Sequence, residues 1–392
     1  MKIITFILLT LLLSCTESDS VFEKSNYECS QVIDQNNQDH PKSKLVSNIM
    51  KSMISKGVPG ILMTVHTNEN GYFSDALGKS DIASNININD CNITRVGSTV
   101  KTFTAVTILK LQEEGKLKLD DLINLYLPEN VLKDIENADK VTIRQLLNHS
   151  SGIYNYIQDL KFQTASLNDF KKVWKVEELL DYARKRNAYF SPGDDVIYSN
   201  TNYIFLGMII EVVEGKHFYE VFKDKIFNPL PLNFTQFAAI DPVPDNIIRG
   251  YIDIYSNLNL INSTYNSGWD YFSADGGLIS NAFDLNVFLT NLFQGNILSD
   301  TSLKEMMTWT KPKKEFGDGF ETSFGLGIFK IETNFGPAYL HSGDAIGYFA
   351  SMVYFPNQKT TITWAVNANY GKMDEIIQSK KSMEFIFKTL LE

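Results

Sequence analysis

Short runs that predict strands lie near both ends of the chain, and those near the C-terminal end alternate between apolar and polar residues. Residues 60–66 and 72–77 form one pair of runs, separated by a turn that ends in Asn-Gly, a strong hairpin signal. Residues 348–355 and 360–368 form a second pair about another polar turn. Strands are therefore expected in two segments that lie far apart in the sequence.

Apolar residues at helical spacing flank these strands and fill the region between them. Gly115 and Gly215 fit as helix stops. Strands at both ends with helices in the middle predict an α+β fold. One antiparallel sheet would be built from N- and C-terminal segments, flanked by helices, with an inserted helical region. The predicted helices span residues 43–56, 98–109, 143–148, 176–185, 203–214 and 373–391.

The helix expected from residue 98 carries Ser98 and Lys101 ahead of an apolar run that reaches Leu109. A hydroxyl three residues before an ammonium lies on the same helix face, within contact distance. Burial in the core, helped by a second nearby cation, would lower the pKa of the lysine toward neutrality. A partly neutral amine can take the proton of the serine and make it a nucleophile. Serine before an apolar helix is more commonly only an N-cap, so the pair needs partners elsewhere.

Those partners are present and carry a resemblance to a known family. Tyr198-Ser199-Asn200 supplies a Y-x-N element and His341-Ser342-Gly343 an H-x-G triplet. With S-x-x-K, this order resembles the penicillin-recognising serine hydrolases. Within them the chain resembles the branch of class C β-lactamases, D-alanyl-D-alanine carboxypeptidases and family VIII esterases, and the likeness covers roughly residues 43 to 390. Further matching stretches are residues 113–121, 141–152, 190–193, 199–207 and 273–280.

The resemblance implies a role for each motif residue and a β-lactamase/transpeptidase-like fold. Ser98 would form the acyl-enzyme, Lys101 would act as base or proton relay, and Tyr198 would pass a proton to the leaving group. Asn200 would hold the amide of the acyl group and steady Lys101. The edge formed by His341, Ser342 and Gly343 would line the cleft, and the backbone N–H of Asp344 would complete an oxyanion hole with that of Ser98. No metal or organic cofactor is implied.

Two residues depart from the pattern of many β-lactamases. His341 replaces a lysine whose fixed charge favours substrates with a carboxylate, whereas histidine is cationic only part of the time at neutral pH. The Asp344 carboxylate would repel an anionic substrate, although the sequence leaves open where its side chain points. These departures disfavour β-lactams. We therefore expect first a D-alanyl-D-alanine carboxypeptidase-like or D-amino-acid peptidase, then a small-ester esterase, then a β-lactamase. A non-catalytic sensor of cell-wall peptides or β-lactams is the rival from another class.

The composition argues against two classes of ligand, nucleic acids and metal ions. The net charge is −10 and the lysines and arginines are dispersed, which argues against nucleic-acid binding. The five histidines show no ligand spacing and no Cys-x-x-Cys occurs, so a metal site is not expected. One of them, His149, could suggest a Ser–His–Asp triad, but its Asn-His-Ser-Ser-Gly context favours a scaffold role. A small-molecule or peptide substrate remains, and the oligomeric state stays open.

The N-terminus resembles a bacterial lipoprotein leader. Residues 1–14 read as a signal peptide whose apolar stretch is too short to span a bilayer, and Cys15 would be the lipidated residue. The alternative is an ordinary signal peptide with an incidental cysteine. Residues 15–42 would then be a polar tether and residues 43–392 the hydrolase domain. We expect a lipid-anchored protein of the bacterial cell envelope that faces the periplasm or the exterior. Cys29 and Cys91 could form a disulfide there, although nothing else in the sequence requires it.

Overall fold

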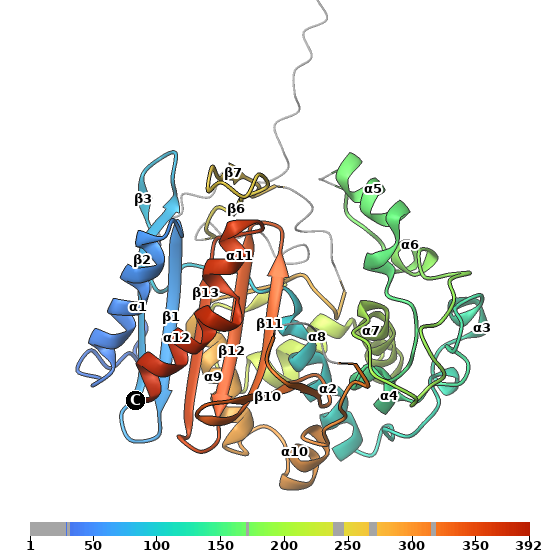
Figure 1. Ribbon diagram of the computed structural model, residues 1–392. Helices are drawn as coiled ribbons and strands as arrows, with labels where there is room; N and C mark the ends of the chain where they lie inside the picture. Colours follow the sequence, from blue (N-terminus) through green and yellow to red (C-terminus); the bar gives the residue numbers. More distant parts are fainter. Residues whose placement is uncertain (1–28, 30–31, 170–171, 238–246, 266–272, 315–318) are drawn as a thin grey trace, which may run out of the picture.

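An antiparallel sheet made from both ends of the chain forms the centre of the molecule (Figure 1). The computed structural model describes residue 29 and residues 32–169, 172–237, 247–265, 273–314 and 319–392. Within these residues the sheet has eight strands in the order β3-β2-β1-β13-β12-β11-β10-β9. In chain order they are β1 (Gly60–Thr67), β2 (Gly71–Asp81), β3 (Ile86–Asn87), β9 (Thr322–Phe324), β10 (Phe329–Thr333), β11 (Gly336–Ala345), β12 (Tyr348–Phe355) and β13 (Thr360–Val366).

Helices cover both faces of the sheet (Figure 1). On one face lie α1 (Ser43–Ser55), α11 (Lys372–Ile377) and α12 (Lys380–Leu391), whose apolar residues form one buried cluster with the strands. On the other face α9 (Ala282–Phe293) packs against β1, β12 and β13. There the Asn286 side chain donates to the carbonyls of Thr64 (3.0 Å) and Thr361 (3.2 Å), which ties the helix to two strands.

The inserted helical region lies on the β11 side of the sheet (Figure 1). Its central helix, α2 (Val100–Glu113), is largely buried. Every residue of α2 from Val100 to Leu109 is buried, as the apolar run predicted. The other helices are α3 (Glu129–Leu132), α4 (Ile143–Leu147), α5 (Leu160–Asn168), α6 (Val176–Asp181), α7 (Asn200–Glu214), α8 (Phe218–Phe222) and α10 (Asp300–Met306), with short helical turns at Gly97–Thr99, Ile123–Leu125, Tyr156–Gln158 and Lys223–Phe227. Two small sheets join β4 (Thr94–Arg95), β8 (Leu278–Ser280) and β5 (Gln236–Phe237), and β14 (Ala368–Asn369), β6 (Tyr251–Ile252) and β7 (Ile261–Asn262).

The predicted elements are present, with shifted boundaries. The helix expected over residues 373–391 is two helices, because Ser379 is extended and its side chain caps α12 by accepting from the Ser382 N–H (3.3 Å). α7 starts at Asn200, before the expected residue 203. α6 ends at Asp181, and turns follow it up to Lys185, which has a positive φ of 56°. Its N–H bonds instead to the Asp134 carbonyl.

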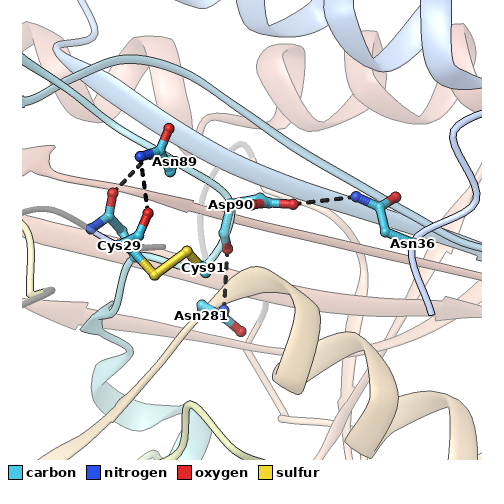
Figure 2. Close-up of a disulfide and its surroundings, with 7 residues drawn as sticks. Cys29, Asn36, Asn89, Asp90, Cys91 and Asn281 are labelled. Atoms are coloured by element: carbon cyan, nitrogen blue, oxygen red, sulfur yellow. Dashed lines mark hydrogen bonds between the residues drawn. A yellow bond between two sulfur atoms is a disulfide. The ribbon is translucent and has the colours of Figure 1, made fainter. Parts of the chain in front are cut away.

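The segment before α1 is fastened to the domain. Cys29 and Cys91 form the disulfide that the sequence allowed (Figure 2). Asn36 donates to the carbonyl of Ser74 (2.8 Å), and Ile33 is buried. The last part of the predicted tether is therefore packed on the sheet, and the folded structure begins before residue 43. The predicted signal peptide and Cys15 lie outside the described residues. No helix in the described ranges is long and apolar enough to cross a membrane.

Candidate active site

Ser98 and Lys101 meet where the helical turn Gly97–Thr99 runs into α2. The Lys101 Nζ donates to Ser98 Oγ over 3.1 Å and to the backbone carbonyl of Asp275 over 2.6 Å. The lysine is fully buried, while Ser98 is partly exposed. This is the contact that the three-residue spacing predicted, between a reachable hydroxyl and a desolvated amine.

Burial has the largest effect on the pKa of Lys101. It lowers the pKa of the amine to about 8, because a charged group loses hydration in the core. The negative charge of Asp275 acts in the opposite direction and holds the pKa up. No second cation among the described residues contributes, which corrects the expectation that one would help. The amine is therefore half neutral near pH 8 and can act as a base there.

Tyr198 completes the group. The Lys101 Nζ lies 5.1 Å from the centre of its ring, and its phenol shares a side-chain hydrogen bond with Ser98. Burial, together with the charges of Asp275 and Asp344, raises the pKa of the phenol far above its usual value. Tyr198 therefore stays protonated and acts as a hydrogen-bond donor rather than as a phenolate base.

His149 belongs to the scaffold of the site, as its sequence context indicated. Its Nδ1 accepts the Ser199 N–H (3.1 Å), and its ring stacks on Tyr198 with 4.4 Å between centres. Its backbone has a positive φ of 61°, in the helix-end turn that precedes Ser150. Burial and the Lys101 charge keep its pKa well below the usual value, so the ring is neutral. It fixes the backbone beside Tyr198, and within the described part of the chain it forms no hydrogen bond with Ser98.

Asp275 is the functional residue that the sequence reasoning missed. It lies in the matched stretch 273–280, to which the sequence analysis assigned no role. Its backbone carbonyl accepts from Lys101, and its buried carboxylate accepts from the Tyr156 hydroxyl (3.0 Å) and from Ser273. An acidic residue directly before the Gly276-Gly277 pair of this stretch was the available signal. Asp275 both accepts a hydrogen bond from the Lys101 amine and, through its charge, favours the protonated form of that amine.

Replacing this carboxylate should move the pH dependence of catalysis. In Asp275→Asn, loss of the anion destabilises protonated Lys101, so the pKa of Lys101 falls. We expect the rising limb of the kcat/KM profile to shift to lower pH, with a fall in the maximum rate of about tenfold or less. Asp284→Asn, at a buried aspartate on α9 that accepts from Thr235, is the control and should leave the limb in place. An unmoved limb in Asp275→Asn would show that its charge does not act on Lys101.

Asn200 lies in the site but has different partners from those expected. Its backbone N–H and its side-chain amide donate to Asn155 Oδ1 (3.1 and 3.2 Å) at the start of α7. Lys101 is instead steadied by Ser98 and Asp275, so the expected Asn200–Lys101 contact is absent from the described residues. Asn200 still lines the cavity in front of Ser98, where it could reach a substrate amide.

The edge of β11 comes unusually close to Ser98. A Cβ added to Gly343 would lie 2.0 Å from the Val96 carbonyl oxygen and 2.5 Å from the Ser98 nitrogen, so only glycine fits. A Cβ on Gly97 would lie 2.8 Å from the Asp344 nitrogen. The backbones of residues 97–98 and 343–344 therefore run against each other. This approach brings together the two N–H groups expected to form the oxyanion hole.

The side chains of this edge point in different directions. His341 is buried, and burial together with the Lys101 charge lowers its pKa to about 3, so it is neutral. Its Nδ1–H donates to the Ser342 carbonyl (2.7 Å). Ser342 bonds to Ser351 on the neighbouring strand (2.8 Å) and does not line the cavity. Asp344 does line it, with a carboxylate that accepts from Gln378 (3.3 Å).

Ser98 faces a cavity of about 250 Å³ between the sheet edge and the helical region. Its wall combines apolar groups with a few polar ones, as in small-molecule sites. Besides Ser98 it is lined by Arg95, Gly97, Ile157, Asn200, residues 275–279, residues 344–346 and Tyr370. Within the described ranges, no group of three or more histidine, cysteine or acidic side chains could hold a metal ion.

The chain is similar in sequence and in fold to several known proteins. A family model described as Beta-lactamase matches residues 43–381. Penicillin-binding protein 4* of Bacillus subtilis is 27% identical over 283 residues, which cover 69% of this chain and 60% of that protein. The chain spans 45% to 64% of the length of several curated relatives that it matches.

Two solved structures match nearly the whole chain. A D-stereospecific amidohydrolase from Streptomyces sp. has a TM-score of 0.76 at 28% identity, covering 89% of this chain and 98% of its own. The octameric penicillin-binding protein homologue from Pyrococcus abyssi has a TM-score of 0.75 at 28% identity, covering 90% and 77%. The sheet and the helical region therefore recur in these proteins.

Proposed function

Because the chain belongs to the β-lactamase family of serine hydrolases, we propose that it cleaves amide bonds in D-amino-acid peptides or amides through an acyl-Ser98 intermediate. Its fold is the β-lactamase/transpeptidase-like fold that the motifs predicted. The observation that carries the proposal is the 3.1 Å contact between Ser98 Oγ and the desolvated Lys101 amine. The Tyr198 phenol at the same hydroxyl supports it.

The proposed reaction has two halves. Neutral Lys101 takes the proton of Ser98 Oγ while that oxygen bonds to the substrate carbonyl carbon, and the resulting oxyanion accepts from the N–H groups of Ser98 and Asp344. Tyr198 relays a proton from Lys101 to the leaving nitrogen, and the C–N bond breaks. Water then attacks the acyl ester, Lys101 again takes a proton, and the acid leaves as Ser98 regains its hydrogen.

The substrate class is narrowed by charge at the strand edge. A carboxypeptidase acting on D-alanyl-D-alanine binds a free carboxylate next to the bond that it cleaves. Here His341 is neutral and Asp344 carries a carboxylate, and both features weigh against that substrate. The 28% identity to a D-stereospecific amidohydrolase supports a D-amino-acid amide or peptide instead.

A substrate panel tests the proposal. We expect repeated turnover of D-alanine p-nitroanilide, with the L-enantiomer at least about tenfold slower. Turnover of p-nitrophenyl acetate without turnover of any amide would indicate that the protein is an esterase and not an amidase. Efficient hydrolysis of penicillin would indicate a β-lactamase. Acylation of Ser98 by penicillin without turnover of any substrate would indicate a sensor.

We also propose that the protein is anchored to the cell envelope by a lipid on Cys15. The Cys29–Cys91 disulfide supports an oxidising compartment outside the cytoplasm. In Cys15→Ser, the protein should move from the membrane fraction to the soluble fraction of lysed cells. A variant that stays with the membranes would contradict the anchor.

A further inference from the structure

The cavity in front of Ser98 carries a carboxylate that no cation of the described chain balances. Asp344 is exposed and lines this cavity beside Ser98. Its charge acts on the phenols of Tyr198 and Tyr370, and raises the pKa of both. Tyr198 lies at Ser98, and Tyr370 lines the cavity, so the Asp344 carboxylate lies close to the candidate active site.

The partners of Asp344 leave its charge in place. The carboxylate accepts from the neutral amides of Gln378 (3.3 Å) and Asn369. Loss of hydration around the carboxylate is the larger cause that raises the pKa of Asp344 to about 6, and the negative charge of the nearby Asp374 on α11 adds to this rise. The carboxylate is therefore ionised at neutral pH, in a region where a positive ligand group would relieve repulsion.

Arg95 is the cation that lines the same cavity, but it is engaged elsewhere. Its Nη2 donates to the Thr264 carbonyl (2.6 Å), and its guanidinium lies 5.0 Å from the centre of the Tyr348 ring. The side chain is buried, with 3% exposure. The carboxylate of Asp344 is therefore an exposed charged group of the cavity wall beside the oxyanion donors.

We propose that the substrate carries a free ammonium on the carbon next to the scissile carbonyl, and that the Asp344 carboxylate binds it. This inference rests on the proposed function and names its substrate class. The substrates would be amino-acid amides, or peptides cleaved after their first residue, in which the α-amino group of that residue is free. The backbone N–H of Asp344 is a proposed oxyanion donor, so its carboxylate lies within one residue of the reacting carbonyl. An ammonium one carbon away is within reach of it. Ile157, Ile346 and Leu278 in the cavity wall would take an apolar side chain.

The test compares two substrates that differ in one group, D-alanine p-nitroanilide and its N-acetyl twin. We expect wild-type kcat/KM to be at least about tenfold higher for the free amine, since a charged hydrogen bond to a carboxylate is worth about that factor. Asp344→Asn should lower the ratio between the two substrates about tenfold, chiefly through KM for the free amine. Asp344→Glu should keep most of the preference. Glu69→Gln, an exposed acid in the turn between β1 and β2, is the charge control and should change neither substrate.

Three outcomes would overturn the inference, and each leaves a different picture. Equal wild-type rates on both substrates, or an unchanged ratio in Asp344→Asn, would remove the ammonium site but leave the amidase. A preference for an N-acetyl peptide that ends in a free carboxylate would indicate that Arg95, and not Asp344, binds the charged group of the substrate. Failure of every substrate to acylate Ser98 would overturn the proposed function itself.

Discussion

Replacing Lys101 with methionine should lower kcat/KM by about a thousandfold, because the variant loses the base that takes the proton of Ser98. The sign of the pH dependence follows from the pKa of about 8 in the wild-type protein. Lys101 is protonated and inactive as a base at lower pH, so wild-type kcat/KM should rise through about pH 8. In Lys101→Met that limb should disappear. Steady-state kinetics from pH 5 to about pH 9.5 measure both effects.

Lys101→Arg separates the base from a structural cation. Arginine keeps the positive charge but does not lose its proton in this range, so it should be as inactive as methionine. Recovery of activity in the arginine variant would contradict the role of base. Methionine also leaves the buried Asp275 carboxylate without its cation, so its thermal midpoint should fall below that of the wild-type protein, and activity is compared at a temperature where both proteins are folded. A collapsed midpoint would mean that the lost activity reports unfolding.

Tyr198→Phe should lower kcat by about a hundredfold to a thousandfold on an amide substrate. The phenol is protonated and hydrogen-bonded to Ser98, so it is placed to pass a proton to the leaving nitrogen. An ester with a good leaving group, such as p-nitrophenyl acetate, needs little protonation of that group. The loss should therefore be clearly smaller on the ester than on the anilide.

The matched control for Tyr198 is Tyr203→Phe. This tyrosine also faces Lys101, with 5.5 Å between Nζ and the ring centre, but its hydroxyl donates to the Leu147 carbonyl (2.8 Å). It should affect stability more than the amide-to-ester ratio. Equal losses on amide and ester in Tyr198→Phe would argue that this phenol only shapes the site.

Local spacing predicted the contact between Ser98 and Lys101, whereas it did not predict the long-range contacts. Ser98 and Lys101 are three residues apart, so helix geometry alone brings them together. The contact from Lys101 to the Asp275 carbonyl spans 174 positions, and no periodicity encodes it. The partner of Asn200 was wrong for the same reason, because Asn155 approaches only through the fold of the helical region.

The strand pattern had a similar limit. It predicted that residues 341–344 line the cleft, but not which side chains turn into it. Ser342 turns to Ser351 on β12, whereas Asp344 turns to the cavity near α11. These directions depend on how β11 passes the Gly97–Thr99 turn, which the close fit of Gly343 sets. The charge of His341 likewise depends on its burial, which its sequence neighbours do not reveal.

The most direct test of the account is to find the atom that becomes acylated. Rapid quenching during turnover of p-nitrophenyl acetate, followed by digestion and mass spectrometry, should give one acyl group per chain, on the peptide that contains Ser98. Its rate of formation should rise with pH through about 8, as Lys101 becomes neutral. An adduct on another residue, or full turnover by Ser98→Ala, would contradict the account.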